Sequence, residues 1–140
     1  MKLRVITGQG VAAAPPADHG IQTLYQRPGL VIQGTPDVAV LGAGGPRPVF
    51  VGGDVVGVGS RAQRLRPLAT GVLELEPLAG RWPVTRWRDA LEGRFVVVAL
   101  GENGDCEIGV DRFARLDLYH QRTDNGTIFA TDLGLLPVSS

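Results

Sequence analysis

The sequence contains little that would tie the chain to a disulfide framework, a membrane or a polyanion. Cys106 is the single cysteine among 140 residues, so no disulfide can form within the chain. Fourteen Lys and Arg residues balance fourteen Asp and Glu residues, which removes the electrostatic pull towards nucleic acid or an anionic membrane. No run of about 18 apolar residues is present to span a membrane. Residues 1–10 lack the apolar stretch of a signal peptide, so we expect a cytoplasmic protein.

Aromatic residues are also scarce, at 6% of the chain, whereas 20 residues are glycine and 10 are proline. This composition favours many short strands and turns over long helices. The hydrophobic fraction of 44% argues against disorder, and the chain is long enough to bury a core. We therefore expect one domain, residues 1–140, of the α+β class and mostly β.

Short apolar runs separated by Gly and Pro predict the strands. Gly34–Asp37 indicates a hairpin between the two runs that flank it, and Gly52–Asp54 indicates another turn. Val11–Gly20, rich in Ala and Pro, is expected to be a loop. The expected strands are Leu3–Thr7, Leu30–Gln33, Val38–Leu41, Pro48–Val51, Val55–Val58, Gly71–Glu76, Arg94–Leu100, Cys106–Val110, Leu116–Gln121 and Thr127–Ala130.

The clearest helix pattern lies at Pro83–Glu92, where Val84, Trp87 and Leu91 recur at helical spacing. Gly93 is expected to cap its C-terminus. A single turn of helix is expected at Ser60–Arg66. The nearly all-apolar run Arg94–Leu100 predicts a central strand covered on both faces, and Asn103-Gly104 predicts the hairpin turn after it.

Few residues have the surroundings that chemistry would need. Cys106 stands beside Asp105 and Glu107, which disfavour a reactive thiolate. His19 and His120 have no clustered Cys or acidic partners, so neither a metal nor another cofactor is expected. The glycine pairs near residues 42–45 and 52–53 are not followed by Lys-Ser/Thr, which indicates turns rather than a phosphate loop. Asp111-Arg112 is expected to form a structural turn.

The last third of the chain carries an ordered set of short motifs. They are Leu91-Glu-Gly-Arg-Phe95, Asp111-Arg-Phe113, Leu118-Tyr119 and Phe129-Ala-Thr-Asp132. In order and spacing they resemble the end of a class II glutamine amidotransferase domain, as found in asparagine synthetases and their relatives. The resemblance covers about 50 residues well. It implies a shortened Ntn-hydrolase-like sandwich of two antiparallel sheets with one or two short helices.

The resemblance also implies a chemistry that this chain lacks. The family cleaves glutamine with an N-terminal cysteine exposed by removal of Met1, and an asparagine-glycine pair stabilises the oxyanion. Lys2 stands where that cysteine would be, and Gly52 stands for the asparagine, followed by Gly53. We therefore expect a pseudoenzyme. An alternative left open is residual amidohydrolase activity with Thr7 as the nucleophile after processing. Another is a module that binds an amino acid or amide near Gly52 and Gly53.

A protein partner is the main functional expectation. In the family the glutaminase domain rests on an ATP-dependent synthetase domain, which suggests an accessory subunit for a separate synthetase or cyclase, or self-association. Trp and Arg are enriched at binding hot spots. The candidate interface residues are Trp82, Arg61, Arg64 and Arg86, whereas Trp87 is expected in the core. No partner among nucleic acids or membranes is expected.

Overall fold

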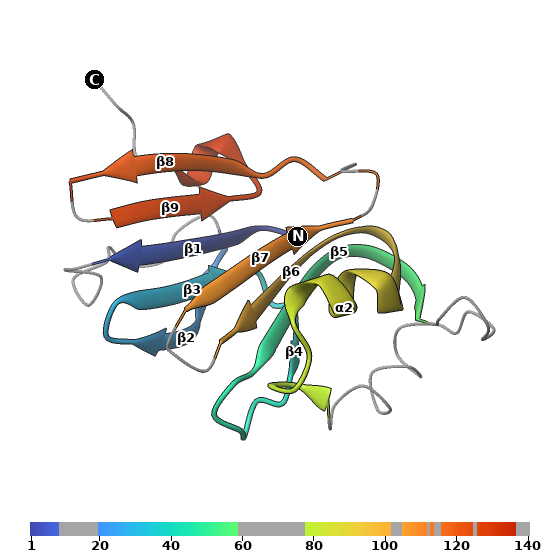
Figure 1. The fold of residues 1–140 in the computed structure, drawn as a ribbon. Helices are drawn as coiled ribbons and strands as arrows, with labels where there is room; N and C mark the ends of the chain where they lie inside the picture. The colour runs from blue at the N-terminus through green and yellow to red at the C-terminus, as the bar shows by residue number, and fades with distance from the viewer. Residues whose placement is uncertain are drawn as a thin grey trace. The chain divides into compact units, whose positions relative to one another are not determined.

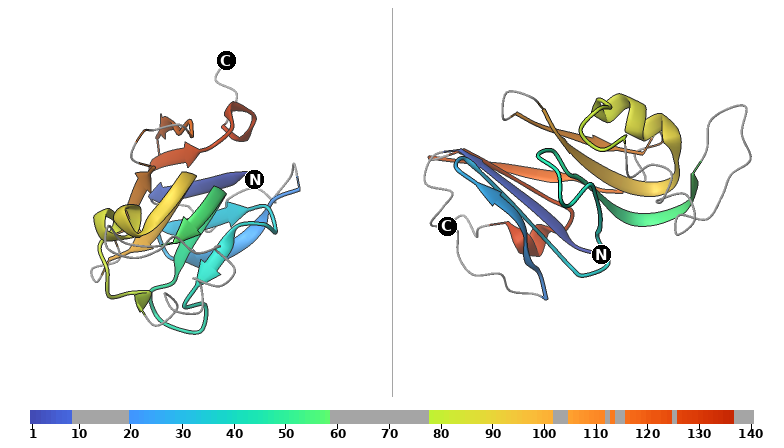
Figure 2. Two further views of the ribbon diagram at one scale, coloured as in Figure 1. Left: turned by 90° about the vertical axis from the view of Figure 1, so that its right-hand side faces the viewer. Right: turned by 90° about the horizontal axis from the view of Figure 1, so that it is seen from below.

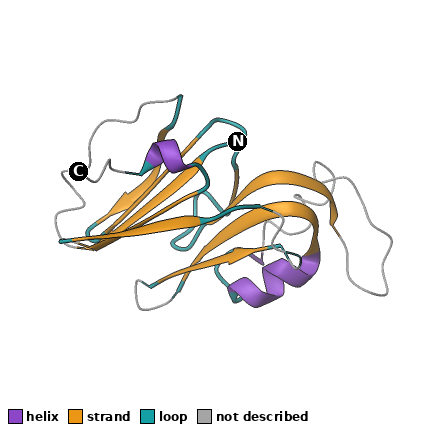
Figure 3. Ribbon diagram, turned by 90° about the horizontal axis from the view of Figure 1, so that it is seen from above, coloured by secondary structure: helices purple, strands orange, loops and turns teal. Residues whose placement is uncertain are grey.

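A computed structural model describes residues 1–8, 20–58, 78–101, 105–111, 113, 116–124 and 126–136. These residues form two antiparallel sheets and one short α-helix, with a 3-10 turn near the C-terminal end. Figures 1 and 3 show the strands and the helix. The expected class, α+β and mostly β with two antiparallel sheets, is confirmed. The chain divides into two compact units, Met1–Val38 with Asp117–Ser140, and Ala39–Leu116.

The first unit is built around its first strand. It contains β1 (Leu3–Gly8), β2 (Gln22–Arg27), β3 (Leu30–Gly34), β8 (Tyr119–Thr123) and β9 (Gly126–Ala130). Their order in the sheet is β2-β3-β1-β9-β8, so β1 pairs on both sides. Val5, for example, lies between Ile32 of β3 and Phe129 of β9. The beginning and the end of the chain thus meet in one sheet.

Alternation along β1 explains its two faces. Leu3 and Val5 are buried on one face, and Arg4 is buried on the other. The guanidinium of Arg4 donates to the side-chain oxygen of Gln33 and to the carbonyl oxygen of Leu135. Leu135 lies in the 3-10 turn η3 (Leu133–Leu135) and packs with Ile21 and Ala130. The buried cation is therefore hydrogen-bonded to the segment that covers its own face.

The second unit contains β4 (Ala39–Leu41), β5 (Val49–Val58), β6 (Leu91–Leu100) and β7 (Cys106–Val110), in the order β4-β5-β6-β7. All six residues from Phe95 to Leu100 are buried, and β6 pairs with strands on both sides. The expectation of a central strand is confirmed. Figure 2 shows the strong curvature of β5 and β6, which carry an irregular pairing between Val55 and Gly57.

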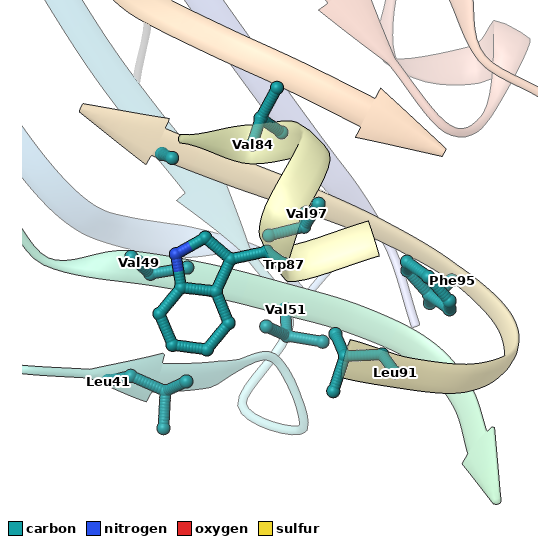
Figure 4. Close-up of a cluster of buried hydrophobic side chains, with 9 residues drawn as sticks. Leu41, Val49, Val51, Val84, Trp87, Leu91, Phe95 and Val97 are labelled. Atoms are coloured by element: carbon teal, nitrogen blue, oxygen red, sulfur yellow. The ribbon is translucent and has the colours of Figure 1, made fainter. Parts of the chain in front are cut away.

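The helix α2 (Val84–Ala90) covers one face of this sheet. Trp87 is fully buried among side chains of β4, β5 and β6, as Figure 4 shows. Truncation of such a side chain costs about 3–5 kcal/mol, and Val84 of the same helix is buried in the same core. Gly109 of β7 allows the helix to approach closely, because a Cβ there would lie 3.0 Å from Val84 and 2.9 Å from Arg88.

The expected hairpin between Leu30–Gln33 and Val38–Leu41 is wrong. These strands lie in different sheets, and β3 pairs with β2 and β1. The turn that makes the hairpin is Pro28-Gly29, where Gly29 has a φ of 83°, as a Pro-Gly turn requires. β2, Gln22–Arg27, is mostly polar and was not expected from the sequence.

Two further expectations about glycines are wrong. Gly52 and Gly53 do not turn the chain but continue β5, opposite Val96 and Phe95. The helix does not end at Glu92 with a glycine cap, because β6 begins at Leu91 directly after Ala90. Gly93 has a φ of 132° within the strand. In both places the strand continues through the glycines, because sheet pairing overrides their turn preference.

Several expected elements lie outside the described residues: the loop before Gly20, the helical turn at Ser60–Arg66, the strand Gly71–Glu76 and the Asn103-Gly104 turn. The strands on either side of that last turn do pair, with Leu100 opposite Cys106. The hairpin of β8 and β9 agrees with expectation. No helix among the described residues is long and apolar enough to cross a bilayer.

Candidate functional site

Position 2, where the resemblance places a nucleophile, is tied into the first unit by its backbone. The N–H of Lys2 donates to Thr35 Oγ1 at 2.9 Å, and its carbonyl accepts from the N–H of Thr35 at 3.0 Å. The Lys2 ammonium lies 3.9 Å from the carboxylate of Asp132. This side chain can form an ion pair, but it presents no thiol or hydroxyl for acyl transfer.

Thr35 also organises the carboxylate next to it. Its hydroxyl donates to Asp37 Oδ1. This hydrogen bond to the charged form lowers the pKa of Asp37. Hydroxyl, carboxylate and backbone groups at this corner are therefore engaged with one another, which is typical of a structural turn.

Gly52 and Gly53, which the resemblance places at the oxyanion site, lie in the second unit. Both are interior residues of β5, and Gly53 has a φ of 115°. A Cβ at Gly53 would lie 2.4 Å from the carbonyl oxygen of Arg94. The glycine is therefore required by the close approach of two strands. Neither residue offers a side-chain donor to an oxyanion.

Thr7 belongs to the central strand of the first unit. It pairs with Leu30 and Thr127, and its hydroxyl donates to the carbonyl oxygen of Thr127 at 3.2 Å. Cleavage before Thr7 would remove Leu3 and Val5, both buried, from the centre of the sheet. The strand pairing and the hydrogen bond of Thr7 therefore indicate a structural role for this residue.

Trp82 and Arg86 are brought together at the start of α2. The Arg86 guanidinium lies over the Trp82 ring, 4.9 Å from its centroid. The Trp82 ring is tilted against that of Trp87, with centroids 5.0 Å apart. Arg86 is exposed and Trp82 is half-buried. The expectation that Trp87 lies in the core is confirmed, since it is fully buried. Trp82 contacts this core residue on one side and is partly exposed to solvent.

The other candidate interface residues, Arg61 and Arg64, lie outside the described residues. Arg81 is exposed directly before Trp82, and Pro83 and Thr85 are exposed beside it. Arg81, Pro83, Thr85 and Arg86 are thus exposed around the half-buried indole of Trp82. We call this surface the α2 patch.

The other residues considered for chemistry are Cys106 and His120. Cys106 is half-buried on β7, and His120 is exposed on β8 with its ring centroid 6.2 Å from that of Phe129. Within the ranges that the structure describes, no three His, Cys, Asp or Glu side chains are grouped so that they would hold a metal ion.

One feature of the Asp-Arg-Phe motif was not expected from the sequence. Asp111 is buried, and its carboxylate accepts from the backbone N–H of Phe95 at 3.3 Å and of Phe113 at 3.2 Å. The Phe113 side chain is 70% exposed. The sequence signal for an exposed Phe113 was its position between Arg112 and Arg115, because a buried apolar strand does not carry two arginines so close together.

No protein-family model, no curated protein and no solved structure matches this chain.

Proposed function

We propose that this chain is a non-catalytic, glutaminase-like domain that acts by binding a protein. The proposal rests on the sequence resemblance to the class II glutamine amidotransferases together with the residues at the former reaction centre. Lys2 provides no acyl-transfer nucleophile, and Gly52 provides no side-chain donor. Without a nucleophile and an oxyanion donor, the domain would be retained for what its surface binds.

The observation that carries the binding proposal is the Trp82–Arg86 pair of the α2 patch. The guanidinium of Arg86 is held against an indole that itself rests on the buried Trp87. Holding two large side chains in place before binding lowers the entropy lost on association. Trp and Arg in such an arrangement are the residues most enriched at hot spots.

The charge of the α2 patch favours an acidic partner surface. Arg81 and Arg86 are both exposed, Arg81 precedes Trp82 in the sequence, and the Arg86 guanidinium lies over the Trp82 ring. Charge complementarity of this kind steers encounter and selects partners. By the resemblance, the partner is a separately encoded, ATP-dependent amide-forming enzyme, to which this chain would be an accessory subunit. Self-association is the other outcome that the binding experiment distinguishes.

The test begins with the tagged chain as bait in an extract of its own cells, and the bound protein is then produced pure. Binding to wild type is compared with the Trp82→Ala/Arg86→Ala variant and with Arg122→Ala, an exposed arginine of the first unit. We expect the double variant to bind at least about tenfold more weakly, and Arg122→Ala to bind as wild type does. Equal binding by the double variant would refute the α2 patch as the interface.

Ammonia release from glutamine is measured on the same preparations. We expect none above the buffer. Release that disappears in Thr7→Ala would overturn the non-catalytic proposal in favour of an amidohydrolase. A monodisperse monomer with no bound protein would refute the accessory-subunit proposal.

A further inference from the structure

The β7 edge of the second sheet is the least protected of the four sheet edges that the described residues form. Edge strands are normally kept short or carry charges that hinder pairing with another chain. β4 has only three residues, β2 is mostly polar and ends at Arg27, and β8 exposes His120 and Arg122. β7 reads Cys-Glu-Ile-Gly-Val, with Glu107 as its one charged residue. It is therefore the edge best suited to pairing with a further strand.

The pairing of β7 with β6 determines which backbone groups of β7 face outwards. The N–H of Asp111 donates to the carbonyl oxygen of Phe95 at 3.0 Å. Hydrogen-bonded pairs recur at every second residue of an antiparallel ladder, so the backbone of Gly109, two residues earlier, is also bonded to β6. The N–H and C=O groups of Ile108 and Val110 therefore point away from β6, where a second strand could bind them.

A second copy of β7 fits this edge in one antiparallel register. All five residues pair when Ile108 is opposite the same residue of the second copy, which places Cys106 opposite Val110 and Glu107 opposite Gly109. Centring the pair on Glu107 would set two carboxylates directly opposite each other, which destabilises a sheet. Centring it on Gly109 would leave only three of the five residues of β7 paired.

The register also brings opposite charges together on the face of the sheet that α2 covers. Gly109 lies beneath α2, since a Cβ there would be 2.9 Å from Cδ of Arg88. Arg88 Nε is buried and has no hydrogen-bond partner among the described residues. Directly opposite residues of an antiparallel pair project to the same face. Glu107 of the second copy would therefore reach the Arg88 guanidinium across a glycine that leaves room for it.

We propose that the β7 edge binds a second copy of this chain, joining the two four-stranded sheets and pairing Glu107 of each copy with Arg88 of the other. Two-fold symmetry forms both ion pairs at once. Charge complementarity favours a second copy over an unrelated strand, because this edge itself carries both the carboxylate and the arginine that it requires. The inference goes beyond the proposed function, since it needs no separate protein partner.

The dimer is expected to be reversible. A contact of five residues from each copy is small compared with the interfaces of permanent dimers. We therefore expect a dissociation constant of about 1–100 μM. Sedimentation equilibrium of the purified chain, at concentrations from about 1 to about 500 μM, measures this constant for wild type and variants.

A charge swap tests the ion pair. Glu107→Arg and Arg88→Glu should each weaken the dimer at least about tenfold, because each places like charges together. The double variant Glu107→Arg/Arg88→Glu should return the dissociation constant to within about threefold of wild type. Arg122→Glu reverses an exposed charge on the β8 edge of the other sheet and should leave the dimer unchanged. Thermal melting followed by tryptophan fluorescence shows whether each variant is folded.

Crosslinking tests the register. In a Cys106→Ser background, Ile108→Cys places two thiols at a hydrogen-bonded pair, where the Cα atoms are about 5.5 Å apart and a disulfide can form. Val110→Cys in the same background is the matched control, because its two copies would be four residues apart along the strand, about 13 Å. We expect mild oxidation to produce a covalent dimer at position 108 and none at position 110.

Three results would overturn the inference. A monomer over the whole concentration range would refute it and leave the proposed function standing, because binding to a separate partner is measured in its own experiment. A dimer that crosslinks at position 110 and not at 108 would exclude this pairing of β7. A double variant that melts as wild type does but fails to restore dimerisation would show that Glu107 and Arg88 do not pair.

Discussion

Replacing Asp111 with alanine should destabilise the second unit, and the structure allows the size of the effect to be worked out. The Phe95 N–H that donates to Asp111 Oδ2 belongs to a residue only 1% exposed. Loss of a charged acceptor from a buried amide costs about 1.5–3 kcal/mol. The second amide belongs to Phe113, where water can replace the carboxylate, so it adds about 0.5–1 kcal/mol. We expect a total near 2–4 kcal/mol.

The assay is urea unfolding followed by tryptophan fluorescence. Both tryptophans of the chain, Trp82 and Trp87, lie in the second unit with Asp111, so the signal reports on the unit that is perturbed. Asp111→Asn keeps one acceptor oxygen and should cost about half as much, near 1–2 kcal/mol. The shift in midpoint is converted to free energy with the wild-type slope.

Asp54→Ala is the matched control, because it removes a carboxylate from the same unit. Asp54 pairs with Arg94 at 3.2 Å, but both side chains are more than half exposed. Exposed ion pairs contribute about 0–1 kcal/mol, so this change should be small. A loss below about 0.5 kcal/mol in Asp111→Ala, or one equal to that of Asp54→Ala, would refute the role of Asp111 in holding the backbone.

Three further outcomes are expected. Gly53→Ala should cost more than about 2 kcal/mol, because a φ of 115° and a Cβ 2.4 Å from a backbone oxygen both oppose it; a neutral result in urea unfolding would contradict this. Trp87→Ala should lower the free energy of unfolding by about 3–5 kcal/mol, and Trp87→Phe by less than about half of that. The smaller loss is expected because Phe keeps an aromatic ring and Trp87 Nε1 has no hydrogen-bond partner among the described residues. Equal losses for the two variants would indicate that Nε1 does have a partner. Because Thr35 lowers the pKa of Asp37, wild type should exceed Asp37→Asn in stability near neutral pH, and the gap should close as pH falls through that lowered pKa. The gap should be small, since Asp37 is 61% exposed, and widening on acidification would contradict the assignment.

The parts of the fold that local pattern determines were predictable. The run from Phe95 to Leu100 is apolar at every position, and only a strand covered on both faces accommodates such a run. Trp87, one turn after Val84, was predicted to be buried, and both are buried. The hairpin of β8 and β9 follows from turn residues between two short runs.

The parts that depend on long-range pairing were not predictable. β2 has few apolar residues, and it forms a strand because Pro28-Gly29 folds it back onto the buried β3. Gly52 and Gly53 read locally as a turn, but pairing with Val96 and Phe95 extends the strand through them. Turn propensity is weaker than the hydrogen bonds and apolar contacts of a sheet.

The same division applies to the candidate interface. The sequence indicated Trp82 and Arg86 by type, because Trp and Arg are enriched at hot spots. That the guanidinium lies over the indole depends on how the chain enters α2 through the extended Pro83, which the sequence alone does not determine. The exposure of Phe113 was not predicted, because an apolar residue type alone gives no sign that its side chain lies at the surface.

The described residues that carry the resemblance and the residues at the positions that would carry its chemistry both have structural roles in this chain. Phe95 is buried, and Asp111 joins it to the backbone of Phe113. Lys2 instead forms backbone bonds with Thr35, and Gly52 is the interior of a strand. Glutamine cleavage of the class II kind requires a nucleophile and an oxyanion donor, whatever the core of the domain. Under the proposed function, the framework to which Phe95 and Asp111 belong would instead support a binding surface.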